Sequence, residues 1–388
     1  MIIGPEFKSF PPSSWGLTVE QFLATAPTLA DFPTPLLTLS RDALDANTAE
    51  MAGWLSARSL RIAPHGKTTM APQLWRELLD AGAWGITLAT PWQVQLGRAH
   101  GLERIMLANS LVDPIALAWL AAELEDPAFD FSCWVDSVET VELMTAALGD
   151  LARPVDVIVE LGSPGARTGA RSLDDALRVA DAVRDSPSLR VRGVGGYEGA
   201  LAHDRSPASL TRVRDWLEQL LELHALLAGH YEGREPIVTA GGSAYVELVA
   251  EALEGVAGIP LLRSGAYQVH DDGFYHSISP LNLRSAMHGW ARVISLPEPG
   301  LALLDGGRRD LPWDEGMPIA LDLPGSEITA LNDQHAFLRL PAGTELAIGD
   351  VVRLGLSHPC SALDRWRLVP VIASLDDPRI VDVIRTYF

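Results

Sequence analysis

The feature that most constrains the fold is a regular alternation of short β-like runs with helical segments, from about residue 60 to residue 263. Strands that alternate with helices pair in parallel, because each helix returns the chain to the starting edge of the sheet. Eight such units predict a closed (β/α)8 TIM-type barrel. The expected strands are Leu60–Ala63, Gly85–Ala89, Ile105–Ala108, Phe131–Val135, Val155–Leu161, Val191–Tyr197, Ile237–Ala240 and Leu261–Arg263, and the expected helices cover 69–81, 91–99, 113–124, 137–148, 172–184, 206–228 and 243–254.

An open, doubly wound sheet is the alternative arrangement for the same alternation. The first strand is not followed by Gly-x-Gly-x-x-Gly, the turn that is typical of dinucleotide-binding sheets. Together with the count of eight strands, this difference favours the barrel.

After about residue 280 the pattern changes from helical to short β-like runs separated by Pro, Gly and Asp, which predicts a smaller, mostly-β domain. We therefore expect an N-terminal extension over 1–33, a barrel domain over 34–280 and a β-rich domain over 281–388. The strand expected at 34–40 precedes the barrel and is a candidate for the β-rich domain. The β-like runs that follow residue 280 are Ala291–Leu296, Ala302–Leu304, Ile319–Leu321, Ala336–Leu340, Val351–Leu356 and Leu368–Ile372.

Composition excludes several classes of partner. A net charge of −20 argues against nucleic acid and anionic membrane surfaces, although backbone dipoles can still hold one phosphate locally. Hydrophobic residues make up 47% of the chain, but no apolar run is long enough to cross a bilayer. The N-terminal residues lack the pattern of a signal peptide, and the presence of only two cysteines argues against a disulfide framework. We expect a cytoplasmic protein.

Lys67 follows the first expected barrel strand, in a turn that contains Pro64 and Gly66. Active sites of such barrels are built from the loops that follow the C-terminal ends of the strands. A lysine that is partly desolvated there has a lowered pKa and can form a Schiff base. The ordinary alternative is a surface lysine in a loop.

Glycine-rich loops follow later strands. Gly241, Gly242 and Ser243 come after the seventh strand, where such barrels hold phosphate: the glycines allow close approach, and Ser243 is placed to cap the next helix. A flexible turn is the alternative. A phosphate site opposite a lysine suggests pyridoxal phosphate, whose aldehyde needs the lysine.

His358 and Cys360 stand two residues apart near the C-terminus. Pro359 favours an extended backbone at His358, and in an extended segment these two side chains point to the same side. An imidazole and a thiolate together form a half-site for zinc with open positions. A buried His and Cys that are close by chance is the alternative.

These motifs together resemble the D-serine dehydratase and D-threonine aldolase family. The resemblance covers nearly the whole chain, and Ser-His-Pro-Cys-Ser-Ala-Leu-Asp-Arg-Trp, from Ser357 to Trp366, is its most specific part. Members are fold-type III pyridoxal phosphate enzymes with an alanine-racemase-like barrel and a C-terminal β domain. By analogy with this fold type we expect a homodimer.

The resemblance implies roles for particular residues. Lys67 would be the Schiff-base lysine, and His358 with Cys360 would bind the metal. The phosphate would lie among Gly241, Gly242, Ser243, Gly265 and Tyr267, with Arg167 and Tyr197 near the cofactor ring and Gln93 also in contact with the cofactor.

The metal motif separates two reactions within the family. Its aldolases typically have His-x-Asp where this chain has His358-Pro359-Cys360, and its dehydratases have His-x-Cys. A thiolate ligand favours zinc, whereas a carboxylate suits harder ions. We therefore expect a pyridoxal phosphate- and Zn2+-dependent dehydratase that converts a small 3-hydroxy D-amino acid to an oxo acid and ammonia.

Three alternatives stay open at this point. Retro-aldol cleavage by a D-threonine aldolase uses the same scaffold. A racemase needs a second base and no metal, which makes it a poorer match. A non-catalytic pyridoxal phosphate-binding protein would need only the barrel and the lysine.

Overall fold

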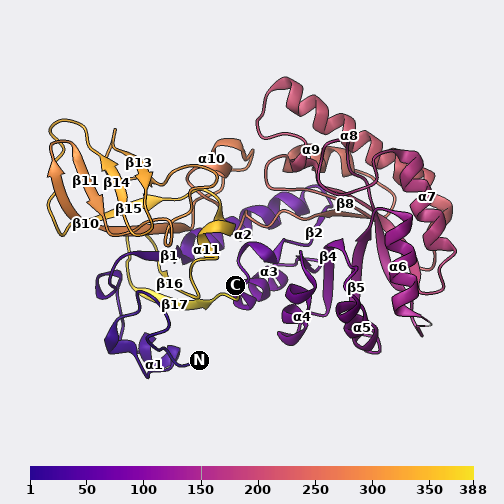
Figure 1. Ribbon diagram of the computed structural model, residues 1–388, viewed down its shortest axis with the longest axis horizontal. Coiled ribbons are helices and arrows are strands. Elements are labelled where there is room, and N and C mark those ends of the chain that lie inside the picture. The colour runs from indigo at the N-terminus through magenta and orange to yellow at the C-terminus, as the bar shows by residue number, and fades with distance from the viewer. Residues whose placement is uncertain (150) are drawn as a thin grey trace. The chain divides into compact units, whose positions relative to one another are not determined.

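The computed structural model describes residues 1–149 and 151–388 and divides into two compact units (Figure 1). The barrel unit comprises 52–67 and 75–265, and the β unit comprises 1–51, 68–74 and 266–388. Both units are assembled from separate stretches of chain. The predicted division into 1–33, 34–280 and 281–388 therefore stays a prediction of domain boundaries. No helix in the described part of the chain has both the length and the apolar character needed to cross a membrane.

The barrel unit contains eight parallel strands in the order β2-β9-β8-β7-β6-β5-β4-β3. Backbone bonds join the two outer strands: Trp84 N–H donates to Ile62 O at 2.7 Å, and Thr87 N–H donates to Pro64 O at 2.9 Å. The sheet thus curls into the predicted barrel. Its strands are β2 (Arg61–Ile62), β3 (Ile86–Leu88), β4 (Arg104–Ser110), β5 (Asp130–Val135), β6 (Val155–Glu160), β7 (Leu189–Gly195), β8 (Ile237–Ala240) and β9 (Ile259–Leu262).

All seven predicted barrel helices are present, and helices α4 to α8 lie along the outer side of the sheet (Figure 1). Capping explains why most of their first residues could be predicted: Asp113, Ser137 and Ser172 each accept a backbone N–H from the residue three positions later. The helices are α3 (Pro72–Asp80), α4 (Pro91–Ala99), α5 (Pro114–Glu123), α6 (Val138–Leu148), α7 (Leu173–Arg184), α8 (Pro207–Leu226) and α9 (Val246–Leu253).

An apolar layer fills the middle of the barrel, because alternate side chains of each strand point inward. Its buried members are Ala63, Met106, Trp134, Ile158, Ile237, Ile259 and Leu261. Polar side chains lie on both sides of this layer: Glu160 and Arg263 where the strands end, and Asp130 and Asp156 where they begin. The two ends of the barrel can therefore carry different chemistry.

The β unit has a nine-stranded sheet, as the loss of helical periodicity predicted. Strand β1 pairs with β10 and β16, so the predicted strand at 34–40 does belong with the β-rich part. The sequence analysis did not predict β13 and β17. The strands are β1 (Leu36–Ser40), β10 (Met287–Glu298), β11 (Leu301–Leu304), β12 (Ile319–Ala320), β13 (Glu327–Leu331), β14 (Ala336–Arg339), β15 (Val351–Gly355), β16 (Leu368–Ile372) and β17 (Ile380–Arg385).

The first 33 residues are part of the β unit. Phe10, Phe22 and Phe32 form an aromatic cluster with ring centroids 5.3 to 6.0 Å apart, and they pack with apolar residues of β1, β16 and β17. The remaining helices of the chain are α1 (Val19–Leu23), α2 (Arg41–Ser56), α10 (Phe274–Ile278) and α11 (Pro359–Leu363).

Candidate functional site

Lys67 lies in a short 3-10 turn, Gly66–Thr68, directly behind β2. The turn requires glycine at position 66, because a β-carbon there would approach Trp75 Nε1 to 2.7 Å. Trp75 donates its indole N–H to Gly66 O at 3.0 Å and holds the turn in place. Lys67 is partly buried, as expected for a lysine at the end of a barrel strand.

The chain contains only two lysines, Lys8 and Lys67. Lys8 belongs to the β unit, where it forms an ion pair with Asp310 at 2.9 Å and lies 3.8 Å from the centroid of the Trp366 ring. Its amine is thus held by structural contacts. Lys67 is the lysine that stands behind a barrel strand.

His65, two residues before Lys67, has a pKa well below its usual value, first because of burial and then because of the charges of Lys67, Arg263 and Arg167. Its imidazole is therefore neutral near pH 7. Its Nδ1 atom is buried and has no hydrogen-bond partner among the described residues. Sequence reasoning did not single out His65, since no spacing marks it.

Gly265 stands against His65. A β-carbon at Gly265 would approach His65 O to 2.5 Å, so the predicted cofactor residue lies directly beside the loop that carries Lys67. Glycine is needed there for close approach of two chain segments.

Arg263 is a fully buried arginine that the sequence analysis overlooked. It donates to Thr239 Oγ1 at 2.6 Å and to Gly196 O, and its guanidinium lies 4.7 Å from the centroid of the Trp134 ring. Burial lowers its pKa to about 10, so it stays charged at neutral pH. Its position directly before Ser264 and the predicted cofactor residue Gly265 is the sequence signal that could have identified Arg263 as a site residue.

The predicted pair of Arg167 and Tyr197 is brought together. The Arg167 guanidinium lies 4.9 Å from the centroid of the Tyr197 ring, a cation–π contact between the loops behind β6 and β7. Both residues are thus held near the ends of the strands.

The amides of Gly241 and Gly242 differ from the expectation that they are available for a phosphate. They donate to the buried carboxylate of Glu198, at 2.9 Å and 2.6 Å. Burial raises the pKa of Glu198, and these two backbone hydrogen bonds oppose that rise. Glu198 therefore holds the Gly241-Gly242 turn in place through hydrogen bonds to both amides. A glutamate eight residues ahead of Ser206, the N-cap of helix α8, gave no sequence signal for this role.

Ser243 does not cap a helix, which corrects the prediction. Helix α9 begins at Val246, and its N-cap residue Tyr245 makes no capping hydrogen bond with its side chain. Ser243 Oγ lies instead 2.7 Å from Ser264 Oγ, so the loops behind β8 and β9 meet through two hydroxyls. With the glycine amides held by Glu198, these hydroxyls become the better candidates for phosphate donors.

We expect Gly242→Leu to weaken pyridoxal phosphate binding by about tenfold or more, a cost of roughly 1.4 kcal/mol. A β-carbon at Gly242 would lie 2.8 Å from Tyr197 Cε2. The leucine side chain must therefore displace the Tyr197 ring, which makes the cation–π contact with Arg167. Absorbance titration of the cofactor-free protein measures the affinity. Gly229→Leu is the control, because a β-carbon at Gly229 meets nothing within 4 Å. Equal cofactor affinity in the two variants would contradict the prediction.

The other two predicted cofactor residues are not joined to this group. Gln93 lies in the first turn of α4, where its side-chain oxygen accepts the Ala89 N–H at 2.8 Å. Tyr267 is buried and belongs to the β unit. Their roles toward the cofactor stay predictions.

Glu160 ends β6 and is 3% exposed. Burial raises its pKa to about 7, the Asp136 charge raises it further, and a hydrogen bond from Thr168 at 2.9 Å opposes the rise. Its Oε2 atom is buried without a partner among the described residues. Glu160 thus titrates near neutral pH inside the site.

We expect Glu160 to make the cofactor-free protein less stable as the pH rises from about 4.5 to about 7. In the unfolded chain the carboxyl ionises near its usual pKa of 4.5, whereas in the folded chain it stays protonated until about pH 7. The loss reaches about 3 kcal/mol above that range, at about 1.4 kcal/mol per pKa unit. Urea unfolding at a series of pH values measures it. Relative to the wild type, Glu160→Gln should reduce this loss of stability by about 3 kcal/mol, whereas the exposed Glu142→Gln should leave it unchanged. An equal loss in Glu160→Gln and the wild type refutes the assignment.

The residues at this end of the barrel fit a bound polar group. Four buried polar atoms lack hydrogen-bond partners among the described residues: His65 Nδ1, Trp134 Nε1, Glu160 Oε2 and Arg263 Nε. Leaving such atoms unpaired is costly, so a ligand that pairs with them is favoured. A pyridine ring with a phosphate arm and a lysine-reactive aldehyde matches this set of donors and acceptors.

The second group of predicted residues lies in the β unit. His358 has φ 63° and ψ 86°, and Cys360 lies in the first turn of α11, so the expected extended backbone is wrong. Asp271 provides the reason: its buried carboxylate accepts the His358 N–H at 2.9 Å and helps to hold the left-handed conformation. Pro359 then begins the helix, where proline is favoured.

The imidazole of His358 and the thiol of Cys360 nevertheless adjoin. A side-chain hydrogen bond with Cys360 is the largest cause that raises the pKa of His358 to about 9, and the Asp314 carboxylate adds to it. Asp314 accepts from His358 Nδ1 at 2.5 Å and from Ser361 Oγ at 2.6 Å. The sequence analysis missed Asp314, which lies 44 residues from His358.

This arrangement fits a metal ion. Metal-binding histidines usually donate their second ring nitrogen to a carboxylate, which is the position of Asp314 here. Within the described residues, no group of three or more His, Cys, Asp or Glu side chains could hold a metal.

A link between the two groups runs through Thr68. The Cys360 thiol donates to Thr68 Oγ1 at 3.5 Å within the β unit, and Thr68 is the residue that follows Lys67. Cys360 therefore contacts a residue that adjoins Lys67 in the sequence.

Comparison with known families gives two matches. Residues 39–265 match the family model "Alanine racemase, N-terminal domain", and residues 286–372 match the family model "Putative serine dehydratase domain". The first match covers more than half of the chain.

Characterised relatives extend the comparison over most of the chain. The D-threonine aldolase of Arthrobacter sp is 28% identical over 335 residues, which cover 85% of this chain and 86% of that protein. The D-threo-3-hydroxyaspartate dehydratase of Delftia sp. (strain HT23) is 25% identical over 361 residues, which cover 86% of this chain and 92% of that protein.

A crystal structure of the D-threonine aldolase from Filomicrobium marinum has a TM-score of 0.82 at 24% identity and covers 93% of this chain and 97% of that one. Structures of a D-threo-3-hydroxyaspartate dehydratase include two variants in which a histidine, or a cysteine two positions later, is alanine; the cysteine variant is in a metal-free form. At these identities the similarity shows a shared fold.

Proposed function

The chain belongs to the family of the alanine racemase N-terminal domain, to which it adds a match to the putative serine dehydratase domain, and on that premise we propose a lyase that depends on pyridoxal phosphate and a metal. Its proposed reaction eliminates water from a small 3-hydroxy D-amino acid, and hydrolysis of the resulting enamine then gives an oxo acid and ammonia. The observation that carries this proposal is the contact of Cys360 with Thr68, which connects a metal pair to the cofactor lysine.

Pyridoxal phosphate bound through Lys67 would supply an electron sink for the α-carbon of the substrate. Around it, Arg167 and Arg263 would balance negative charge, and Ser243 with Ser264 would donate to a phosphate. The amine of Lys67 is the group placed to take the α-proton. The neutral imidazole of His65 lies beside it and, lacking a positive charge, does not oppose protonation of that amine.

His358 and Cys360 would hold the metal, for which we propose Zn2+ because thiolate and imidazole are ligands that it prefers. A metal there would act as a Lewis acid on the β-hydroxyl of the substrate. Asp314 fixes the orientation of the His358 ring, and Asp271 fixes its backbone. We also keep a homodimer and a cytoplasmic location as proposals.

The thiolate ligand is what favours dehydration over aldol cleavage. In this chain the histidine and cysteine are two positions apart, which is the spacing of the two residues replaced in the dehydratase variants. The alternative is a retro-aldol reaction that gives glycine and an aldehyde. It is supported by the higher identity to the D-threonine aldolase, 28% against 25%.

Product analysis tests the proposal. The purified protein, loaded with pyridoxal phosphate and Zn2+, is incubated with D-serine, D-threonine and D-3-hydroxyaspartate, and ammonia, oxo acids, glycine and aldehydes are measured. Ammonia and an oxo acid in equal amounts support the dehydratase. Glycine as the main product from D-threonine supports the aldolase, and no turnover of any of the three refutes both.

A further inference from the structure

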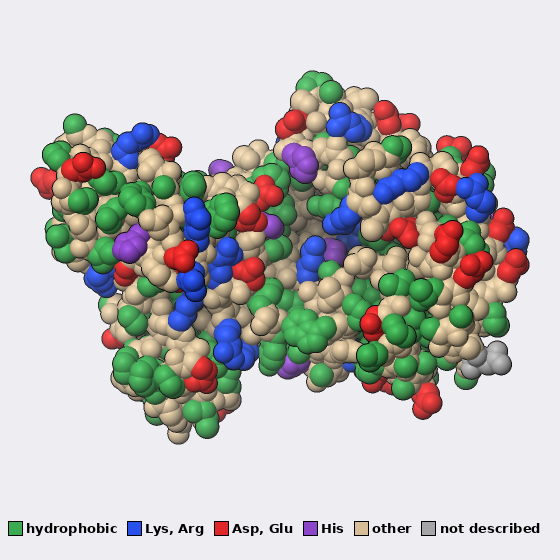
Figure 2. Space-filling view, viewed as in Figure 1, with side chains coloured by type: hydrophobic (Ala, Val, Ile, Leu, Met, Phe, Trp, Pro, Cys, Tyr) green, Lys and Arg blue, Asp and Glu red, His purple; other side chains and the backbone are tan. Residues whose placement is uncertain are grey.

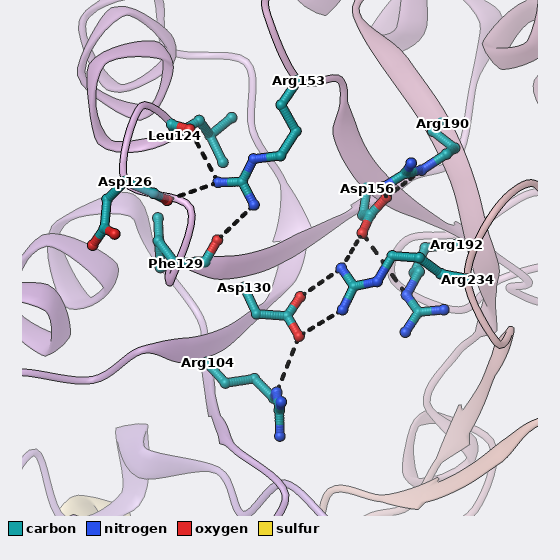
Figure 3. A network of polar contacts seen from close by, with 10 residues as sticks. All are labelled: Arg104, Leu124, Asp126, Phe129, Asp130, Arg153, Asp156, Arg190, Arg192 and Arg234. Carbon is teal, nitrogen blue, oxygen red and sulfur yellow. Dashed lines mark hydrogen bonds and ion pairs between the residues drawn. The ribbon is translucent and has the colours of Figure 1, made fainter.

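A cluster of arginines lies where the barrel strands begin (Figure 3). Lys67 follows the end of β2 and so belongs to the opposite end of the parallel strands. Arg104 and Asp130 are the first residues of β4 and β5, and Asp156 is the second residue of β6. Arg190 and Arg192 point from β7 toward the same place, and Arg234 stands just before β8. The proposed catalytic function does not use this group.

The two aspartates of the cluster are fully engaged. Arg234 makes a two-pronged contact with Asp130, at 2.9 Å for each nitrogen, and it also reaches Asp156 at 2.8 Å. Arg104 binds Asp130 at 3.0 Å, and Arg190 binds Asp156 at 2.6 Å. The two carboxylates thus already form ion pairs with three guanidinium groups.

A fourth arginine, Arg192, is left with a weak partner. It is 5% exposed, and its nearest carboxylate, Asp156, lies 3.8 Å from its Nε. Its Nη1 is buried without a hydrogen-bond partner among the described residues. Burial and the nearby Arg234 charge both lower its pKa. A buried cation with so little compensation is costly.

A fifth arginine, Arg153, is held in place by backbone carbonyls and no carboxylate. Its guanidinium donates to the carbonyl oxygens of Phe129, Leu124 and Asp126 at 3.0 to 3.1 Å. Five arginines therefore face two aspartates, an excess of three positive charges, in a chain whose net charge is −20. The visible surface over α7 and α8 differs from this cluster, because acidic and basic side chains are mixed there (Figure 2).

Four of the five arginines line an open hollow. The lining includes Arg104, Arg153, Arg190 and Arg234, together with Asp130 and Asp156, and the hollow measures about 770 Å³ with the open solvent at its mouth. Arginine forks match oxyanions in shape, and their field is strongest in a hollow with low-dielectric walls. The lining is thus arranged for a negative ligand.

We propose that this hollow binds a small oxyanion with at least two negative charges, such as inorganic phosphate or a dicarboxylate. The anion supplies the negative charge that the two aspartates do not provide and draws hydrogen bonds from the arginines at the rim. A group with one charge leaves most of the excess uncompensated, so we expect much weaker binding of acetate than of phosphate.

Calorimetric titration tests this with the cofactor-loaded protein, whose own phosphate site is filled. Inorganic phosphate, malonate and acetate are compared at constant ionic strength. We expect saturable binding of phosphate or malonate, and the tighter of the two identifies the class of ligand. Arg190→Gln should raise the dissociation constant at least tenfold, and Arg178→Gln, an exposed residue of α7 in a local ion pair, should leave it unchanged.

Asp130→Asn separates a binding role from a structural one. It removes a negative charge from the lining and frees Arg104 and Arg234, so phosphate should bind more tightly although the unliganded protein becomes less stable. If Arg190→Gln does not fold, Arg104→Gln at the rim replaces it. Absence of saturable binding to the wild-type protein, an unchanged affinity in the arginine variant, or weaker binding in Asp130→Asn would each overturn the proposal.

Discussion

Lys67→Ala is expected to abolish turnover, with a loss of at least roughly 10³-fold, because one amine both anchors the cofactor and takes the α-proton. The variant should also lose the absorbance of lysine-bound pyridoxal phosphate. Its fold should be retained, since Gly66 and Trp75, which fix the turn, are unchanged. Circular dichroism and urea unfolding check the fold, and ammonia release checks the activity.

Lys8 makes this test unusually clean, because it is the only other lysine in the chain. Borohydride reduction of the loaded protein, followed by digestion and mass spectrometry, should place the cofactor on Lys67. Lys8→Ala should keep the adduct and the activity, although it loses an ion pair with Asp310. An adduct on Lys8, or full activity in Lys67→Ala, would refute the assignment.

Cys360→Ala is expected to reduce ammonia release from a 3-hydroxy D-amino acid by about 10²-fold or more. Hydroxide is a poor leaving group, and Lewis-acid assistance to its departure is worth several kcal/mol. Removal of the metal with a chelator should have the same effect, and added Zn2+ should restore the wild-type protein but not the variant. Metal analysis by mass spectrometry measures the bound zinc directly.

Cys133→Ala is the matched control, because Cys133 is the other cysteine of the chain and is buried in β5. Burial raises the pKa of its thiol to about 12, which makes it a poor ligand and nucleophile. The control should keep its zinc and its activity. Binding of D-serine to the cofactor should persist in Cys360→Ala, since that step needs Lys67 and not the metal. Full ammonia release from a metal-free preparation would contradict the mechanism.

Several features of this protein could be predicted from local sequence. The barrel strands and most helix starts follow from alternation and from capping residues such as Asp113 and Ser137, which act within a few positions of the chain. Lys67 could be found for the same reason, because its place behind a strand is a local property. The closeness of His358 and Cys360 in the chain also brought their side chains together, although through a left-handed His358 and a helix start and not through the expected extended backbone.

The parts that could not be predicted depend on contacts between residues far apart in the chain. Glu198 takes the amides of Gly241 and Gly242, which lie 43 and 44 positions away, and Asp271 holds the backbone of His358 from 87 positions away. Such contacts leave no local pattern.

The arginine cluster shows the same division. Each arginine is ordinary in its own segment, and only the closure of the barrel brings Arg104, Arg192 and Arg234 together. The sequence by itself therefore determined the barrel, the position of Lys67 after a barrel strand and the proximity of His358 to Cys360, because these depend on short-range periodicity and spacing. The tertiary structure alone decided which polar groups are buried, paired or left uncompensated, since burial and charge balance depend on the whole fold.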